Sequence, residues 1–300
     1  MQTIVVGGSG MIGRAIQREI RSQKETSEFT FSYKTNKLKI PSAKNLYLDL
    51  FDQDSTKQLR DFSRAIYLAG NTDHGLASKD PTKDAQLNIE AFLNFTKFYK
   101  GTLVLFSSQA VYYGHKGKIK EDAAQRPTIP YGISRHAAEM YAEYFKQAGK
   151  FSSLAILRPT YVFGEGEKER RLIPRCARAA IKNDTLTVFG KGQSFLNPLP
   201  VEFVARVAVR INQEIASHEH DMSINLNHPD PMTVLELVQT LQDAKPFRCV
   251  VEEGGEEWPA LHYGNANFLL RLLKQWRMEM PDVKRVLRQY FMSLTEGKQE

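Results

Sequence analysis

The sequence predicts an α/β protein with a doubly wound parallel sheet and a second, smaller α/β lobe. Two observations support this fold class. Apolar runs typical of strands alternate with amphipathic helical patterns through the first half of the chain, which is the rhythm of βαβ units. The chain has 300 residues with 42% apolar side chains, enough to bury a large core.

The first half of the chain holds the regular part of this pattern. Strands are predicted over residues 3–8, 29–33, 45–50, 64–70, 102–108 and 153–164. Helices are predicted over residues 10–23, 54–62, 84–100 and 131–147. Because parallel strands need crossover connections, these helices should cover both faces of one sheet.

The second half of the chain is less regular. Helices are predicted over residues 171–183, 201–215 and 233–244 and from residue 266 onward, and strands over residues 185–190 and 247–253. We therefore expect a first domain of residues 1–165 plus about 199–227. Residues 166–198 and 228–300 should form a smaller lobe.

The composition limits the kinds of partner. The net charge of +7 is spread along the chain, and phosphates on a small molecule account for it as well as nucleic acid does. Cys176 and Cys249 lack the spacing of zinc ligands, so we predict neither a disulfide framework nor a metal site. With no signal-peptide pattern and no apolar run of about 18 residues, we expect a cytoplasmic protein without a membrane partner.

A glycine-rich turn joins the first predicted strand to the first helix. Gly7, Gly10 and Gly13 form a GxxGxxG pattern in the segment GGSGMIG. Such glycines let the chain turn tightly, let backbone N–H groups approach a pyrophosphate, and let the helix pack closely on the sheet. The strand before and the helix after favour dinucleotide binding over a purely structural turn.

The end of the second predicted strand indicates which dinucleotide binds. NAD is usually met there by a carboxylate on the ribose hydroxyls, whereas the 2′-phosphate of NADP is met by cationic or small polar groups. Residues 29–39 contain no Asp or Glu, and Ser32, Lys34 and Lys37 are present. We therefore favour NADP over NAD, although a lysine at a strand end is also ordinary solvated surface. Asp49 either accepts from the adenine amino group or caps the next turn.

The segment YGISR opens the helix predicted over residues 131–147. Tyr131 and Arg135 are four residues apart, which places them on one helical face with Cβ atoms about 5–6 Å apart. A fixed cation beside a phenol favours the phenolate. The pair is a candidate acid/base site, and the alternative is that the two residues merely open an amphipathic helix.

These motifs together resemble a known family. The motifs are GGSGMIG, Asp49, LAG at 68–70, Asn88, SSQAVYYG, YGISR, LRPTYVFG and LTVFGKGQ. In this order they are similar to the extended short-chain dehydrogenase/reductase superfamily, and within it to the NAD(P)-dependent sugar-nucleotide epimerase/dehydratase family. The resemblance covers nearly the whole chain. It implies that the first domain is an NAD(P)-binding Rossmann domain and that the smaller lobe binds the substrate.

The resemblance also implies a catalytic set of Ser108, Tyr131 and Arg135. Tyr131 matches the acid/base tyrosine, and Ser108 matches the residue that positions the substrate oxygen. The family has a lysine at position 135, which lowers the pKa of the tyrosine and holds the nicotinamide ribose. Arg135 is permanently charged and can fill the first role, but its planar guanidinium cannot pass on a proton.

Binding residues follow from the same resemblance. The predicted cofactor-binding residues are Gly7, Gly10, Met11, Ile12, Gly13, Ser32, Lys34, Asp49, Leu50, Leu68, Ala69, Gly70, Tyr131, Arg135 and Pro159. The predicted substrate-binding residues are Ser108, Gln109, Arg170, Arg171 and Arg175.

Two departures from the family narrow the expected reaction and substrate contacts. Dehydratases of the family carry an acid pair where this chain has Gln109 and Ala110, so we predict hydride chemistry without dehydration. The arginine that commonly grips the nucleotide diphosphate is replaced by Leu196. Arginines at 170, 171, 175 and 178 suit phosphate and are candidates to compensate, although those at 175 and 178 equally fit the solvated side of a helix.

Two classes of function remain open. The first is an NAD(P)-dependent oxidoreductase or epimerase that moves a hydride to or from a hydroxyl or ketone of a nucleotide sugar. The second is an NAD(P)-binding sensor or scaffold with weakened catalysis. Ser108 and Tyr131 favour the first class, and Arg135 and Leu196 favour the second. By resemblance, the apolar stripes of residues 91–99 and 137–145 predict a homodimer, and no nucleic-acid partner is expected.

Overall fold

The computed structural model describes residues 2–23, 28–36, 44–215, 221–254 and 260–296. Lys37 and its predicted contact with a 2′-phosphate lie outside this part of the chain. The chain divides into two compact units. The first unit comprises Met1–Tyr112, Ala124–Pro159 and Glu202–Ile224, and the second comprises Tyr113–Ala123, Thr160–Val201 and Asn225–Glu300.

The division differs from the predicted boundaries chiefly at one internal segment, and by a few residues at 160–165, 199–201 and 225–227. Residues 113–123, predicted in the first domain, belong to the second unit. The reason is strand pairing, because β6 (Gly117–Ile119) lies parallel to β13 (His262–Gly264) from the far end of the chain. Sequence patterns do not report such pairing, since it joins segments more than a hundred residues apart.

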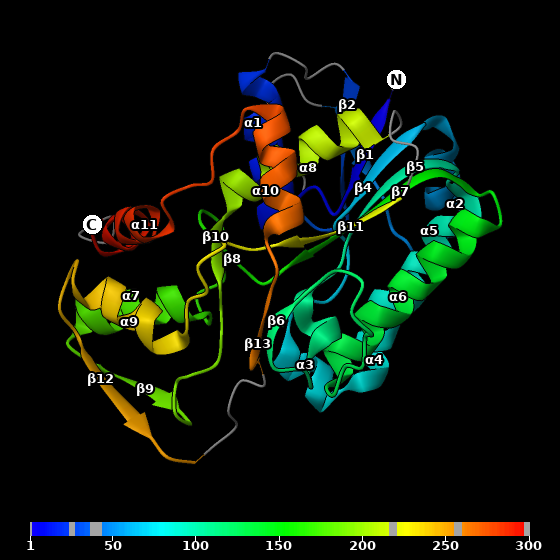
Figure 1. Ribbon diagram of the computed structural model, residues 1–300. Coiled ribbons are helices and arrows are strands. Elements are labelled where there is room, and N and C mark those ends of the chain that lie inside the picture. The colour runs from blue at the N-terminus through cyan, green and yellow to red at the C-terminus, as the bar shows by residue number, and fades with distance from the viewer. Residues whose placement is uncertain (1, 24–27, 37–43, 216–220, 255–259, 297–300) are drawn as a thin grey trace. The chain divides into compact units, whose positions relative to one another are not determined.

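A seven-stranded sheet organises the first unit (Figure 1). The strand order is β11-β7-β5-β4-β1-β2-β3, and every neighbouring pair from β3 to β7 is parallel. The strands are β1 (Thr3–Val6), β2 (Phe29–Tyr33), β3 (Lys44–Tyr47), β4 (Arg64–Tyr67), β5 (Gly101–Phe106), β7 (Phe151–Pro159) and β11 (Met222–Leu226). The predicted Rossmann-type doubly wound fold is confirmed.

Helices cover both faces of this sheet. Helices α2, α5 and α6 lie on one face, and α1 and α8 lie on the other (Figure 1). The helices are α1 (Met11–Ser22), α2 (Gln53–Lys57), η2 (Gln58–Asp61), α3 (His74–Lys79), α4 (Pro81–Ala85), η3 (Gln86–Glu90), α5 (Ala91–Phe98), η4 (Gln109–Tyr112), α6 (Pro130–Gln147) and α8 (Val201–Glu214).

The core beneath α5 and α6 is aromatic. Phe92 and Phe95 of α5 pack on Tyr67 of β4, with ring centroids 5.2 Å and 5.0 Å apart, and all three side chains are buried. Ala138 and Ala142 of α6 join the same cluster. Small residues on α6 let this helix approach the sheet closely, which fixes the position of its N-terminal turn.

The sheet order reverses between β1 and β4. Chain connections run outward in opposite directions from these two neighbouring strands. In doubly wound sheets the ligand binds at the carboxyl ends of the strands beside such a reversal. A ligand site is therefore expected beside the segments that follow β1, β4 and β5.

The predicted helix over residues 84–100 differs in detail from the structure. Helical structure starts at Pro81, and the segment Gln86–Glu90 is a π-helix between α4 and α5. The side-chain amide of Asn88, inside this segment, bonds groups of three other segments and is buried. A π-turn widens the helix by one residue and commonly occurs where a side chain is needed at a site.

The second unit consists of short paired strands and helices. Its further elements are β8 (Tyr161–Phe163), α7 (Leu172–Lys182), β9 (Thr185–Phe189), β10 (Pro198–Pro200), α9 (Val234–Gln242), β12 (Arg248–Glu252), α10 (Asn267–Trp276) and α11 (Val283–Glu296). Strands β8 and β10 pair in parallel, as do β9 and β12. The strand predicted over residues 153–164 is interrupted at Thr160, whose hydroxyl donates to the Asn197 carbonyl oxygen.

Within the described residues, no helix is long and apolar enough to cross a membrane. The cytoplasmic location stays a prediction. The same residues contain no group of three or more His, Cys, Asp or Glu side chains that could hold a metal ion.

Candidate functional site

The glycine-rich turn has the geometry that dinucleotide binding requires. Gly7 has a φ of 81°, which L residues rarely adopt, and the Gly10 N–H donates to the Gly7 carbonyl oxygen at 3.0 Å. A Cβ at Gly13 would lie 2.3 Å from the carbonyl oxygen of Gly8, so only glycine permits this approach of α1. The turn therefore presents backbone N–H groups at the N-terminus of α1.

A cavity of about 240 Å³ opens beside this turn. Seven of the predicted cofactor-binding residues line it, namely Gly7, Ser32, Lys34, Asp49, Leu50, Ala69 and Gly70. Its wall also includes residues that sequence reasoning missed, namely Ser9, Phe51, Leu87 and Ala91. The predicted residues Gly10, Met11, Ile12, Gly13, Leu68 and Pro159 do not line this cavity. The cavity follows the ends of β1, β2 and β3 and has the position of a nucleotide pocket.

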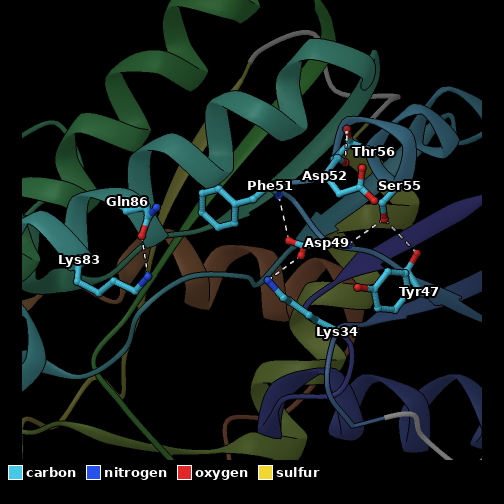
Figure 2. Close-up of polar contacts among 9 residues, drawn as sticks. All are labelled: Lys34, Tyr47, Asp49, Phe51, Asp52, Ser55, Thr56, Lys83 and Gln86. Carbon is cyan, nitrogen blue, oxygen red and sulfur yellow. Dashed lines mark hydrogen bonds and ion pairs between the residues drawn. The ribbon is translucent and has the colours of Figure 1, made fainter.

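Lys34 and Asp49 form an ion pair at the cavity (Figure 2). The Lys34 ammonium lies 2.8 Å from one Asp49 carboxylate oxygen, and the other oxygen accepts from the Phe51 N–H at 3.0 Å. The hydrogen bond from Lys34 holds the pKa of Asp49 below its ordinary value. The Lys34 side chain is 57% exposed, so the ammonium can still turn toward a bound phosphate.

Ser32 has a structural role beneath the glycine turn. Its side chain is buried, and its hydroxyl oxygen accepts from the Gly7 N–H at 2.9 Å. We predicted Ser32 as a residue that would receive the 2′-phosphate. In the structure its hydroxyl first of all fixes the turn between β1 and α1.

Tyr131 and Ser108 come from two segments that touch. Tyr131 is in the first turn of α6, after Pro130, and Ser108 precedes η4. A Cβ at Gly132 would lie 2.4 Å from the Ala110 carbonyl oxygen, so the start of α6 packs directly against η4. Tyr131 and Ser108 are 6% and 9% exposed. The Ser108 hydroxyl oxygen accepts from the Ala110 N–H at 3.1 Å, which orients its side chain.

The Arg135 guanidinium is buried and bonded to the backbone. It donates to the Asn71 carbonyl oxygen at 2.6 Å and to the Phe106 carbonyl oxygen at 3.3 Å. The Asn71 carbonyl lies in the segment after β4, and the Phe106 carbonyl is at the end of β5. Arg135 therefore links the two strands at their carboxyl ends. The guanidinium carbon lies 5.4 Å from the Tyr131 ring centroid. The predicted proximity of the cation and the phenol is present, and the arginine fork spans two carbonyls at once.

A buried polar network supports this arrangement. The Asn88 amide oxygen accepts from the Asn71 N–H at 2.8 Å, and its nitrogen donates to Asp84 and to the Ser134 hydroxyl, both at 2.9 Å. The Asn71 side chain donates to the same Asp84 oxygen at 2.7 Å. Sequence analysis noted Asn88 but missed Asn71 and Asp84. Asp84 has one signal, a polar residue at the start of the helix predicted over residues 84–100, and Asn71 lies in a loop that no pattern marks.

His74 lies against the candidate catalytic tyrosine. The rings of His74 and Tyr131 have centroids 4.2 Å apart and planes at 33°. His74 is the first residue of α3, and the Asp73 carboxylate caps this helix by accepting from the Gly75 N–H at 3.0 Å. Sequence reasoning missed His74, because no motif marks a histidine in the segment after β4.

A buried ion pair joins α6 to the end of β7. Arg158 donates to both carboxylate oxygens of Glu139, with the shortest contact at 2.7 Å, and both side chains are about 1% exposed. Arg158 also hydrogen-bonds the Tyr112 hydroxyl and lies over its ring. Since Tyr112 ends η4, the ion pair ties the segment after Ser108 to the helix that carries Tyr131.

In the second unit, the predicted substrate arginines differ in how they are held. Arg171 lies 4.1 Å from the Tyr161 ring centroid, pairs with Glu167 at 3.4 Å and donates to the Val162 carbonyl oxygen at 2.7 Å. Arg170 and Arg175 are exposed. Arg171 is thus part of an internal polar cluster, whereas the side chains of Arg170 and Arg175 lie at the surface of the unit. Leu196, which stands at the position of the family's diphosphate-binding arginine, is buried.

The model of the NAD dependent epimerase/dehydratase family matches residues 3–226. The chain belongs to this family. The match includes the glycine turn, Ser108 and Tyr131, and the extended short-chain dehydrogenase/reductase resemblance is thereby confirmed.

Known proteins similar to the chain span most or all of it. The chain is 22% identical over 270 residues to the uncharacterized UDP-glucose epimerase YtcB of Bacillus subtilis (strain 168). This alignment covers 81% of the chain and 82% of that protein. The structure of MoeE5 in complex with UDP-glucose and NAD is 19% identical with a TM-score of 0.86, covering 100% of both chains. RMD from Pseudomonas aeruginosa complexed with NADPH is 23% identical with a TM-score of 0.77, covering 99% and 100%. These structures share the fold of the chain.

Proposed function

We propose that the protein is an NAD(P)-dependent oxidoreductase or epimerase that moves a hydride to or from a hydroxyl or ketone of a nucleotide sugar. Tyr131 exchanges a proton with the substrate oxygen, and Ser108 positions that oxygen. The nicotinamide supplies or accepts the hydride when the dinucleotide is bound. The glycine turn holds the pyrophosphate, and Lys34 and Asp49 flank the adenosine end.

The contact between Gly132 and Ala110 carries this proposal. It brings the segment after β5, with Ser108, against the start of α6, with Tyr131. Because β1, β4 and β5 are parallel, the glycine turn and Ser108 lie at the same edge of the sheet. A dinucleotide that enters at the turn and runs along this edge meets both hydroxyls.

A substrate panel tests the proposed function. Wild type and Tyr131→Phe are incubated with NADP or NAD and with UDP-, TDP- and GDP-sugars carrying a hydroxyl or ketone at each ring position. Nicotinamide absorbance reports net oxidation or reduction, and chromatography of the sugars reports epimerisation, which leaves no net change in the nicotinamide. Tyr131→Phe should lose turnover and keep its dinucleotide affinity. If the wild-type protein converts none of the sugars in the panel, the catalytic proposal is refuted.

For the cofactor we propose NADP in preference to NAD. The exposed Lys34 ammonium at the cavity wall supports this choice, and the end of β2 carries no carboxylate. MoeE5 is described with NAD and RMD with NADPH, so this fold accommodates either dinucleotide. The fold alone therefore does not decide between them.

For the substrate we propose that Arg170 and Arg175 contact the nucleotide diphosphate. Both side chains are exposed at the surface of the second unit, and guanidinium groups suit phosphate oxygens. Calorimetric titration with UDP, TDP and GDP should give weaker binding for Arg175→Ala than for wild type. A charge-matched Lys182→Ala variant from the far end of α7 serves as control and should bind as wild type does. Absence of binding by all three nucleotides would contradict the nucleotide-sugar assignment.

We also propose that dehydration is absent. The carboxyl and carboxylate pair that would protonate a leaving hydroxyl is replaced by Gln109 and Ala110, which are both buried. Products from the substrate panel should therefore keep all their hydroxyl or keto oxygens. Loss of water, seen by mass spectrometry, would contradict this part of the proposal.

A sensor or scaffold that binds NAD(P) without turnover is the second candidate function. It is favoured by the two hydrogen bonds that Arg135 donates to backbone carbonyl oxygens. Because of these bonds, the guanidinium is less free to bind a ribose than the ammonium of a lysine would be. Under this alternative, Tyr131→Phe changes only stability. The same panel separates the two candidates.

We further propose a homodimer through the exposed face of α6. Ile133, Met140 and Tyr144 are 53%, 56% and 61% exposed, although such side chains are usually buried. A second copy of this chain would cover them. Sedimentation velocity should show a dimer for wild type and a monomer for Tyr144→Glu, and a monomeric wild type would refute the proposal.

A further inference from the structure

The direction of the Tyr131 phenol is decided by packing. The phenol oxygen of a tyrosine lies on the Cβ–Cγ axis, so its position is set by rotation about the Cα–Cβ bond. In a helix this bond has two common staggered positions, so the backbone of α6 alone does not fix where the phenol points. Proton exchange requires the phenol oxygen within hydrogen-bond reach of the substrate oxygen. Groups that contact the ring therefore determine how often Tyr131 is in a productive orientation.

A histidine and an arginine lie against this ring. The His74 imidazole lies with its centroid 4.2 Å from that of Tyr131 and its plane tilted by 33°. The Arg135 guanidinium carbon lies 5.4 Å from the same centroid. A ring at this separation and tilt is in close van der Waals contact with the phenol, and it limits movement of the phenol about the Cα–Cβ bond more than a guanidinium carbon 5.4 Å from the centroid does.

The position of His74 is itself held by Arg135. The Arg135 guanidinium donates to the Asn71 carbonyl oxygen at 2.6 Å. The Asn71 side chain then closes a short loop, because its oxygen accepts from the Asp73 N–H at 2.8 Å and its nitrogen donates to the Asp73 carbonyl oxygen at 2.9 Å. His74 directly follows this loop. One arginine thus contacts the tyrosine and anchors the segment from which the imidazole reaches it.

We propose that His74 is a positioning residue for Tyr131: its imidazole, placed by the loop that Arg135 anchors at Asn71, keeps the phenol pointing toward the substrate oxygen. This inference rests on the proposed acid/base function of Tyr131. It gives Arg135 a role suited to a guanidinium, since the planar fork reaches the Asn71 and Phe106 carbonyls together.

Substitutions at His74 separate the ring contact from the ring nitrogens. His74→Ala removes the contact and should lower kcat about two- to tenfold, the factor that corresponds to an aromatic pair, with KM for the dinucleotide unchanged. His74→Phe keeps a ring of similar size and should restore kcat to within about twofold of wild type. His228→Phe, in the second unit, is the matched control and should behave as wild type does.

A fluorine NMR measurement tests the same inference without turnover. Protein labelled with fluorotyrosine gives one signal per tyrosine, and Tyr131→Phe identifies the signal of Tyr131. In His74→Ala this signal should shift and broaden because the ring loses its neighbour, and in His74→Phe it should regain its width. This readout stays valid if wild type turns over no nucleotide sugar, so failure of the proposed function is distinguishable.

Two results would overturn the inference. The first is a Tyr131 fluorine signal that is the same in wild type and His74→Ala. The second is a His74→Phe variant that loses as much kcat as His74→Ala, since the imidazole nitrogens rather than the ring contact would then matter.

Discussion

The Arg135 guanidinium donates a hydrogen bond of 2.6 Å to the Asn71 carbonyl oxygen, in the segment that follows β4. Asn71 is itself bonded to Asn88 and Asp84. The residue at the family's lysine position is thus connected to a buried network that shapes the loop beside the site. Its replacement should affect stability and reaction in different ways.

Arg135→Lys is expected to lower the free energy of unfolding by about 1–3 kcal/mol, because an ammonium cannot bond both buried carbonyls in the same geometry. The ammonium can keep the bond to the Asn71 carbonyl oxygen that anchors the loop before His74, and it can relay a proton. Turnover should therefore stay similar or rise, with a shifted pH optimum. Urea denaturation and the pH profile of kcat measure the two effects. An unchanged midpoint of denaturation would mean that the two carbonyl contacts contribute little.

Lys34→Ala is expected to reverse the preference between the dinucleotides. The substitution removes the ammonium proposed to meet the 2′-phosphate and leaves the Asp49 carboxylate free for ribose hydroxyls. Wild type should show a larger thermal shift with NADPH than with NADH, and Lys34→Ala the opposite order, because the tighter ligand stabilises more. Lys57→Ala, on α2, is a matched surface control. A larger shift of wild type with NADH would refute the NADP preference.

Glu139→Gln is expected to lower the free energy of unfolding by about 3–5 kcal/mol, because the buried Arg158 charge would lose its partner. Replacing both residues, as in Glu139→Gln with Arg158→Met, should recover much of this loss, since no buried charge remains uncompensated. Chemical denaturation measures the double-mutant cycle. Asp54→Asn, which breaks an exposed pair with Lys57, should produce no measurable change. Additive effects of the two buried substitutions would argue against a coupled pair.

Alkylation is expected to reach Cys249 well before Cys176. Burial raises the pKa of the Cys176 thiol from its usual 9.0 to about 12, so its thiolate is scarce at pH 8, and Cys249 is only partly buried. The raised pKa also makes stability depend on pH. The favourable contribution of the Cys176 thiol to the free energy of unfolding is complete below pH 9 and is lost as the pH rises toward 12. Peptide mass spectrometry after iodoacetamide treatment measures the order. Equal rates of labelling in the folded protein would contradict it.

Sequence patterns predicted the parts of the molecule that depend on local residues. The glycine turn requires particular residues within one short segment, and the pairing of Tyr131 with Arg135 depends on one helical turn. His74 and Asn71 could not be predicted, because their loop takes its shape from Asn88, seventeen positions along the chain. Arg171 was predicted as a phosphate ligand from its residue type, but its contact with Tyr161 depends on how the second unit folds.

The π-turn at Gln86–Glu90 has a consequence for insertions and deletions. A π-turn accommodates one extra residue within a helix, so removing one residue from this segment would re-form a regular helix and leave the turns on either side nearly in place. The widened turn that carries Asn88 would be lost, and the bonds from Asn88 to Asn71 and Asp84 that support the loop after β4 would be lost with it. Length at this point of the chain is therefore as constrained as residue identity, and a deletion here should cost more than most substitutions of the same residues.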